Sequence, residues 1–385
     1  MALKLKLFRM AKSGTVSVHL KKSTPTPVLL LSGKYRGVRP VQTTSGRAGQ
    51  TLLWSLVWMA LCCTINCVTG IRAGTVSVSP VGVAAEDASF RCPQAQRTGE
   101  DVVTIETKLA GVPAILRVPG HVTRPPIVLW HGFGAPASGR ALMAALPLDD
   151  VPAVKVYLGL PLFGSRAPAG GNKELARRQT LDFAMLLFKP AVVGAADELR
   201  SVVAALVQHG CMSAGQQIGL FGFSAGGTAA LVALMQGGVP VSAVVLVNAS
   251  TGLNASVDAW QRALGRRYAW TPASRALARE TDAVRRAADI ARGKSLPAIL
   301  IMQGGADTVL TTTPARSLHR ALLPYYRRAH GQARLGFIVV PGMPHGWTDD
   351  RTAITRVRHE AAAWFVQNLE QPTGSEPLAS TVRGG

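Results

Sequence analysis

The pentapeptide GFSAG at Gly222–Gly226 follows the apolar run Gln217–Phe221 and leads into Ala225–Met235, a run of small residues compatible with a helix. A serine flanked by glycines two positions away, between a strand and a helix, is typical of a sharp turn that holds the hydroxyl clear of a sheet. A side chain at either glycine would collide across so tight a bend. The pentapeptide alone is weak evidence, so the rest of the chain has to supply the context.

Short apolar runs, most of them rich in β-branched residues, alternate with helix-compatible stretches from residue 102 onward. The predicted strands are Val102–Leu109, Val112–Val118, Ile127–Trp130, Val154–Leu160, Gln217–Phe221, Val241–Val247, Ala298–Met302 and Leu335–Val340. The predicted helices are Ser138–Leu146, Ala195–Gln208, Ala225–Met235, Pro314–Leu323 and Arg351–Leu369. This alternation predicts an α/β fold with a mostly parallel eight-stranded sheet and helices on both faces. Pro113 confines the second strand to an edge of the sheet or to a late start.

Two segments, Phe163–Pro190 and Ser250–Lys294, are longer than simple connections require. Insertions after the strands of such a sheet commonly form a lid. We therefore expect a helical lid at 250–294, with ordinary covering helices as the alternative for both segments.

The formal charge of +21 over 385 residues is unevenly distributed. Residues 1–85 hold eleven Lys and Arg and no Asp or Glu, which leaves a net charge of +10 on the rest. The charges of that remainder are mixed, and its arginine pairs lie in or beside helix-like stretches. The composition therefore does not favour nucleic-acid binding.

The N-terminal part contains an uncharged apolar run at 51–68. We predict a basic leader without structure at 1–50, a signal or membrane-anchor segment at 51–70, a linker at 71–100, a catalytic domain at 101–370 and a flexible tail at 371–385. Because positive charge precedes the run, the N-terminus is expected on the cytoplasmic side and the main domain outside. The main domain is then either exported (periplasmic or secreted) or anchored to the membrane through 51–68. The location is cytoplasmic if the run is not a true signal. Cleavage after the run and the oligomeric state remain open.

The five cysteines show no spacing typical of metal ligands, so neither a metal site nor a cofactor is predicted. Three of them lie in or beside the apolar run, which leaves Cys92 and Cys211 near the predicted domain. In an exported protein these two could form a disulfide; two reduced thiols are the alternative.

A serine hydroxyl needs a base, a group that orients the base, and donors for the developing oxyanion. His345 lies in a Pro/Gly-rich loop directly after the last predicted strand, where it can reach the serine at the carboxyl edge of the sheet. Asp307 follows the preceding strand and is the candidate for the orienting acid. The alternative is an aspartate that only braces its own turn. Asn248 occupies the other position where such an acid can stand, which favours Asp307.

The segment WHGFG at 130–134 follows the third predicted strand. Its glycines allow the backbone N–H of Phe133 to point toward the serine, and the N–H of Ala225 is the second oxyanion donor. We interpret His131 as a residue that braces this loop rather than as a second base. Substrate contacts are predicted from Gly132, Leu162, Phe163 and Trp347; plain core packing is the alternative.

The motifs HGFG (131–134), GFSAG (222–226), GGADTV (304–309) and PGMPHG (341–346) together resemble those of an α/β-hydrolase. The resemblance is to the dienelactone-hydrolase-like and acyl-peptidase-like serine esterases, and it covers about Asp101–Leu369. It implies the α/β-hydrolase fold and the chain order Ser224, Asp307, His345 for the catalytic residues. Dienelactone hydrolases proper use a cysteine nucleophile, so dienelactone itself is not an expected substrate.

The predicted function is hydrolysis of a small-molecule carboxylic ester through an acyl-enzyme. A peptidase or amidase of the prolyl-oligopeptidase kind is the alternative among enzymes, although the chain lacks room for the propeller that such enzymes often carry. A non-catalytic binding protein with this fold is the third reading. Against this third reading, the candidate nucleophile, acid and base each lie at the end of a predicted strand, and a binding protein has no need of all three there.

Overall fold

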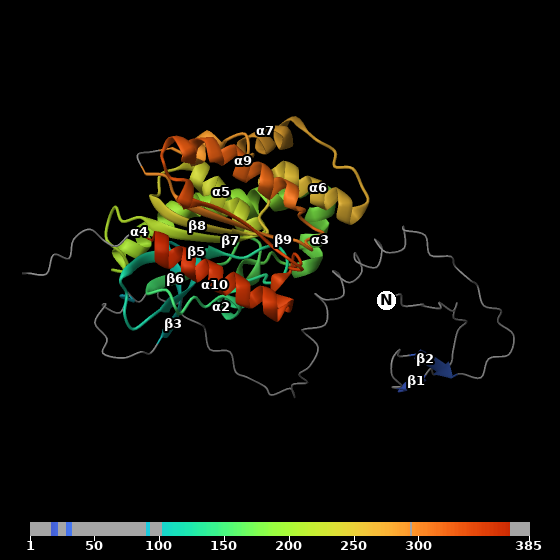
Figure 1. Ribbon diagram of the computed structural model, residues 1–385. Helices are drawn as coiled ribbons and strands as arrows, with labels where there is room; N and C mark the ends of the chain where they lie inside the picture. Colours follow the sequence, from blue (N-terminus) through green and yellow to red (C-terminus); the bar gives the residue numbers. More distant parts are fainter. Residues whose placement is uncertain (1–16, 22–27, 33–89, 93–101, 293–294, 370–385) are drawn as a thin grey trace, which may run out of the picture. The chain divides into compact units, whose positions relative to one another are not determined.

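The structure is a computed structural model that describes residues 17–21, 28–32, 90–92, 102–292 and 295–369 (Figure 1). The chain divides into two units, Met1–Cys67 and Val68–Gly385. The expected signal or anchor segment at 51–70 and the tail at 371–385 lie outside the described residues, as does the linker at 71–100 apart from 90–92. Among the residues that are described, no helix has the length and apolar character needed to cross a membrane.

The first unit contains one pair of antiparallel strands, β1 (Ser17–Lys21) and β2 (Val28–Ser32). The prediction that 1–50 has no regular structure is wrong for these ten residues. Each segment contains one Val, a residue that favours extended backbone, and this weak signal was obscured by the basic composition around it. The remainder of the predicted leader lies outside the described residues.

The second unit is built on an eight-stranded sheet in the order β10-β9-β8-β7-β5-β6-β4-β3. The strands are β3 (Val103–Leu109), β4 (Val112–Val118), β5 (Arg124–Trp130), β6 (Ala153–Leu158), β7 (Ile218–Phe223), β8 (Val241–Val247), β9 (Ala298–Gly304) and β10 (Leu335–Val340). The β3–β4 and β4–β6 pairs are antiparallel, and all other pairs are parallel. The predicted mostly parallel eight-stranded sheet is confirmed.

Strand β4 shows how Pro113 is accommodated. The strand is paired on both sides, so it is not the edge that the proline suggested. Its ladder with β6 begins only at Ala114, one residue after the proline. Because proline has no N–H to donate, pairing toward β6 starts late, which was the other expected outcome.

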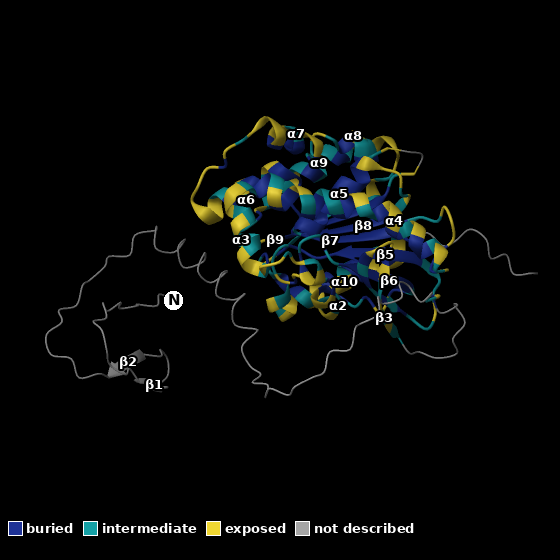
Figure 2. Cartoon of the chain, turned by 180° about the vertical axis from the view of Figure 1, so that it is seen from behind, coloured by how far each residue is buried: buried dark blue, intermediate teal, exposed yellow. Residues whose placement is uncertain are grey.

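Helices cover both faces of the sheet (Figure 1). The apolar side chains of α2 (Gly139–Ala145) and α10 (Arg351–Asn368) enter one core cluster, and those of α4 (Gly194–Gln208), α5 (Ala225–Gln236) and α9 (Thr312–Arg328) enter the other. Figure 2 shows the central strands buried between these layers, as expected for parallel strands covered on both faces. Helix α9 starts two residues before the predicted Pro314 and continues through Pro324.

The two long insertions carry their own helices. The first contains η1 (Gly164–Arg166), α3 (Gly171–Asp182) and the π-helix η2 (Phe183–Val193); the second contains α6 (Leu253–Leu264), α7 (Pro272–Glu280) and α8 (Ala287–Ile290). The indole of Trp260 donates a hydrogen bond to the carbonyl of Gln179 (3.1 Å), and the Tyr268 hydroxyl donates one to Asp182. These bonds join the two insertions, although they lie far apart in the sequence.

A disulfide joins Cys92 to Cys211, just after α4. The ring of Phe90 stacks on that of His209 at 4.4 Å, and the backbone N–H of Cys92 donates to the His209 carbonyl (2.9 Å). Of the two states expected for these cysteines, the structure has the bonded one. Residues 90–92 are thereby fastened to the end of α4.

Candidate active site

Ser224 occupies the turn between β7 and α5. Its backbone has φ +52° and ψ −117°, a conformation that a non-glycine residue rarely adopts. A Cβ built on Gly222 would lie 2.4 Å from the carbonyl oxygen of Gly226, and one built on Gly226 would lie 2.4 Å from the carbonyl oxygen of His131. The flanking glycines are therefore required by close backbone contacts. The serine itself is only partly buried and can be reached from solvent.

His345 lies in the loop after β10, and its Nε2 is 3.0 Å from the Ser224 hydroxyl oxygen. On the other side of the ring, Nδ1 is 2.8 Å from Oδ2 of Asp307. The histidine and the aspartate are both 7% exposed. The structure thus brings the three residues, predicted from three separate strand ends, into one hydrogen-bonded row.

The carboxylate of Asp307 is held from several directions. Its Oδ1 accepts hydrogen bonds from the backbone N–H groups of Val309 and Leu310, each at 2.8 Å, and its Oδ2 accepts one from Nε2 of Gln303 at 3.0 Å. The first pair braces the turn, as the alternative interpretation of Asp307 proposed, while Oδ2 is still available to His345. One carboxylate makes both sets of contacts.

Gln303 was missed by the sequence analysis. It is 1% exposed in β9, and its amide also donates to the carbonyl of Leu310 (2.8 Å). A glutamine in an otherwise apolar, fully buried strand was the available signal, because buried amides in native proteins have hydrogen-bond partners.

These contacts determine how the imidazole is protonated. An ionised carboxylate only accepts hydrogen bonds, so Nδ1 of His345 carries the proton that lies toward Asp307. Nε2 then has a free lone pair facing the Ser224 hydroxyl. This arrangement can remove the serine proton as the oxygen attacks a carbonyl carbon, and it can stabilise the imidazolium that results.

The HGFG loop lies directly against the elbow. A Cβ on Gly132 would be 2.9 Å from Cβ of Ser224, so glycine allows the loop to approach the serine. His131 is fully buried; its Nε2 accepts a hydrogen bond from the Leu160 N–H (3.1 Å), and its Nδ1 bonds the Gly132 carbonyl (2.7 Å). Burial lowers the pKa of His131 to about 4. The residue is thus a neutral brace, and its ring is engaged with backbone groups rather than with Ser224.

The two predicted oxyanion donors are backbone N–H groups, one in the HGFG loop that lies against Ser224 and one in the residue that follows Ser224. Ala225 begins α5, where the first N–H groups of a helix have no partner within the helix. The carbonyl of Gly132 is engaged by His131, and the N–H of the same trans peptide, that of Phe133, points the opposite way. The backbone N–H groups of both residues thus remain the candidates for holding an oxyanion.

The predicted substrate-contact residues separate into two groups. Phe163 stacks on Phe133 with ring centroids 5.0 Å apart, and Phe183 from the π-helix meets Phe133 edge-on at 6.5 Å. Leu162, with φ +73°, is partly buried and packs against the core cluster that contains Phe163 and Phe183. Trp347, in contrast, has no exposed surface and packs edge-on against Phe223 in the core cluster on the α10 face. Core packing, the alternative interpretation, describes Trp347.

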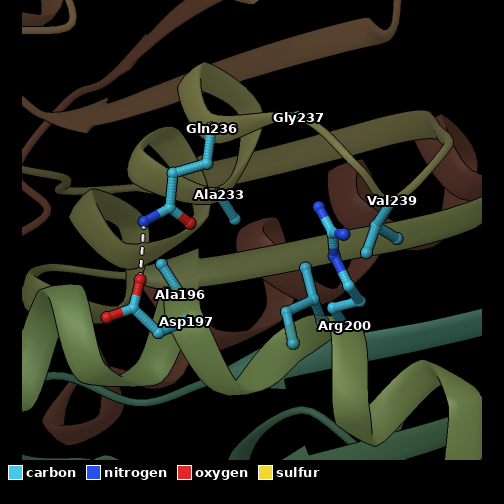
Figure 3. Close-up of a pocket in the computed structure, with 8 residues that line it drawn as sticks. Ala196, Asp197, Arg200, Ala233, Gln236, Gly237 and Val239 are labelled. Atoms are coloured by element: carbon cyan, nitrogen blue, oxygen red, sulfur yellow. Dashed lines mark hydrogen bonds between the residues drawn. The ribbon is translucent and has the colours of Figure 1, made fainter.

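A cavity of about 240 Å³ lies elsewhere, where Asp197 of α4 faces Gln236 at the end of α5 and Arg200 of α4 lies beside Val239 (Figure 3). Ser224 precedes the first residue of α5, so the two places are separated by the length of that helix, about 17 Å. Within the described part of the chain, no group of three or more His, Cys, Asp or Glu side chains could hold a metal ion.

Comparison with known proteins gives a family match and fold relatives. The sequence model of the prolyl oligopeptidase family matches residues 193–372, a range that includes Ser224, Asp307 and His345. The solved structure of TT1662 from Thermus thermophilus is 20% identical with a TM-score of 0.52, covering 69% of this chain and 98% of that one.

Two further structures are similar at lower scores. Carboxyl esterase 2 from Tuber melanosporum is 17% identical with a TM-score of 0.48, covering 73% of this chain and 91% of its own. A puromycin-hydrolyzing peptidase from Mycobacterium tuberculosis is 18% identical with a TM-score of 0.49, covering 74% of this chain and 42% of its own. No curated protein matches the sequence.

Proposed function

We propose that this chain, a serine hydrolase of the α/β-hydrolase type, cleaves carboxylic esters that carry an apolar group, through an acyl-enzyme intermediate. The observation that carries the proposal is the hydrogen-bonded row of Ser224, His345 and Asp307. The partly accessible serine at the start of the row, in a strained turn, supports its role as the nucleophile.

In the proposed reaction, the Ser224 oxygen attacks the ester carbonyl carbon while Nε2 of His345 takes the hydroxyl proton. The N–H groups of Phe133 and Ala225 hold the oxyanion of the tetrahedral intermediate. The imidazolium, stabilised by Asp307, then gives its proton to the departing alcohol, and the acyl group stays on the serine. Deacylation follows the same steps with water as the nucleophile. His345 takes a proton from water, the water oxygen attacks the acyl carbon, and the proton is returned to the Ser224 oxygen as the carboxylic acid leaves.

The aromatic rings around the proposed oxyanion donor support an apolar substrate group. Phe133 is partly exposed, and its ring touches both Phe163 after β6 and Phe183 in the first insertion. Burying apolar substrate surface against such rings is favourable by about 25 cal/mol per Å². An acyl or alcohol group of this kind would be held beside the reacting carbonyl.

A peptidase or amidase is the second candidate, favoured by the match to the prolyl oligopeptidase family over residues 193–372. Amide cleavage would use the same three side chains, with His345 protonating an amine instead of an alcohol. Leaving-group chemistry therefore has to distinguish the two candidates.

The experiment compares p-nitrophenyl esters and p-nitroanilides that share the same acyl group, over a series of acyl lengths. The proposal expects ester turnover that rises with apolar acyl length and is abolished in Ser224→Ala, with anilide turnover far lower. Comparable turnover of the two series would support the peptidase candidate. A wild-type protein that neither turns over any substrate nor reacts with a fluorophosphonate would overturn the hydrolase proposal in favour of a binding protein.

The disulfide between Cys92 and Cys211 supports a further part of the proposal, that the domain works outside the cytoplasm. Disulfides persist in oxidising compartments and are rare where thiols are kept reduced. Intact-mass measurement and N-terminal sequencing of the mature protein would test this. A soluble cytoplasmic species that begins at Met1 and carries five free thiols would contradict it.

A further inference from the structure

Asn248 directly follows β8, which lies between β9, the strand before Asp307, and β7, the strand before Ser224. It is fully buried, and its backbone has φ +45°. Asparagine tolerates this left-handed conformation better than most residues. The side chain therefore leaves the strand end toward neighbouring backbone rather than toward solvent.

The amide of Asn248 makes three hydrogen bonds, all to backbone. Its Nδ2 donates to the carbonyls of Pro344 and His345, each at 3.0 Å. Its Oδ1 accepts from the N–H of Gly304 at 2.7 Å. Gly304 ends β9 three residues before Asp307, so one side chain links the start of the acid's turn to the loop of the base.

We infer that Asn248 is a positioning residue that sets the His345 ring against Asp307 and Ser224; this rests on the proposed function. The earlier part of the loop is tied down by backbone bonds, from Gly305 to Val340 and from Ala306 to Met343. The Pro344 carbonyl has Asn248 as its donor and no other among the described residues. Asn248 thus restrains the two residues at which the loop delivers the imidazole.

The bonding pattern requires an amide of this length. Two donors face carbonyl oxygens while one acceptor faces an N–H, a combination that an aspartate lacks because its carboxylate only accepts. Asn248→Asp would place a negative charge against the carbonyls of Pro344 and His345. Asn248→Ala would leave a buried N–H and a buried carbonyl unpaired, and the loop would be free to shift. Displacement of a catalytic group by about 1 Å can cost on the order of 100-fold in rate.

The test measures kcat and KM for the best p-nitrophenyl ester in Asn248→Ala, Asn248→Asp and the wild type. We expect kcat to fall about 10- to 100-fold in both variants with KM within about twofold, and the fluorophosphonate labelling rate to fall in parallel. The Nδ1 proton of His345, observed by NMR, should shift or broaden in both. Asn368→Ala is the matched control, because Asn368 also donates its amide to a backbone carbonyl, that of Trp364 (3.0 Å), but lies in α10.

A folded Asn248→Ala protein with kcat within twofold of wild type and an unchanged His345 proton signal would overturn the inference, whatever its melting temperature. If that variant does not fold, Asn248→Ser, which keeps a small polar group, is judged by the same criteria. A wild-type protein without ester or amide turnover would instead refute the proposed function, so the two failures are distinguishable.

Discussion

Two loops at the same edge of the sheet each carry a buried histidine. His131 follows β5 and His345 follows β10, and both ring nitrogens of each have a hydrogen-bond partner. The partners of His345 are side chains, a hydroxyl and a carboxylate, whereas those of His131 are backbone groups. The same residue type can therefore move a proton in one loop and only hold the chain in the other.

The difference also concerns charge. A protonated His345 would lie 2.8 Å from the Asp307 carboxylate, which stabilises the imidazolium. The ring contacts of His131 provide no such anion, and burial lowers its pKa to about 4. What surrounds each ring, rather than its depth alone, decides which histidine can act as a base.

Removing the carboxylate that distinguishes His345 from His131 should have the largest effect on catalysis. Asp307→Asn should lower kcat by about 10⁴-fold, because the amide can no longer both hold the Nδ1 tautomer and stabilise the imidazolium. Steady-state kinetics on the best ester substrate measures this. Asp258→Asn, an exposed aspartate on α6, is the matched control. A loss of less than tenfold would remove Asp307 from the proposed mechanism.

The burial of His131 should make folding sensitive to acid. Its folded pKa, about 4, lies below the usual value of 6.5, so between these pH values the unfolded chain binds a proton that the folded chain excludes. The free energy of unfolding should therefore fall as the pH drops through this window, by about 3 kcal/mol in total at ~1.4 kcal/mol per pKa unit. Urea unfolding at pH 7 and pH 4 measures it.

In His131→Gln this part of the pH dependence should disappear, because glutamine does not titrate. His359→Gln, at an exposed histidine on α10, should leave it in place. An equally steep acid dependence in His131→Gln would mean that other groups cause it.

Removing the brace should affect catalysis less than removing Asp307. His131→Ala deletes the bonds to Gly132 and Leu160, so the peptide that carries the Phe133 N–H loses its fixed orientation. We expect kcat to fall about thirtyfold (~2 kcal/mol), less than the roughly 10²- to 10³-fold loss typical of deleting an oxyanion donor. His131→Asn, which can still donate to the Gly132 carbonyl, should recover part of the loss. A loss as large as that in Asp307→Asn would contradict the distinction between the loops.

Lys155, like His131, is a buried base with a backbone hydrogen-bond partner, and replacing it should change stability by the least. Lys155 in β6 is fully buried and donates to the Val151 carbonyl (3.1 Å), and burial lowers its pKa to about 8. Below that pH the native state holds a costly buried cation, so Lys155→Met should raise the free energy of unfolding at pH 7 by about 1 kcal/mol.

This gain in the free energy of unfolding should shrink as the pH rises from 8 to 10.5. Over that range the Lys155 amine of the wild type keeps its proton in the unfolded chain but loses it in the folded chain, so the wild type becomes more stable. Denaturant titration at pH 7 and pH 10 measures both values. Lys108→Met, at an exposed lysine of β3, is the control. A destabilised Lys155→Met protein would show that the charge of Lys155 contributes more than its burial costs.

Much of the sheet could be predicted because its signals are local. Buried parallel strands consist of short β-branched runs, and the strand β8 was predicted with its observed ends. The candidate nucleophile, acid and base were found because parallel strands deliver their carboxyl ends to a single edge. Ser224, Asp307 and His345 each follow a recognisable strand, so their proximity follows from topology.

Other features depend on contacts that no local pattern carries. The π-helix at Phe183–Val193, the links between the two insertions and the burial of Trp347 arise from packing between segments far apart in the chain. Gln303 and Asn248 were visible as polar residues at or near strand ends, but their roles depend on which backbone groups come within about 3 Å.

Residue type, periodicity and backbone freedom over short stretches were enough to predict the strands of the sheet, the turn at Ser224 and the residues able to carry the chemistry. The folded chain was needed to show which groups hold the Asp307 carboxylate, how Asn248 ties the loop of His345 to the strand before Asp307, and which aromatic rings surround Phe133. Hydrogen bonds and ring contacts act over a few ångströms, and the distances between remote residues are established only when the chain has folded.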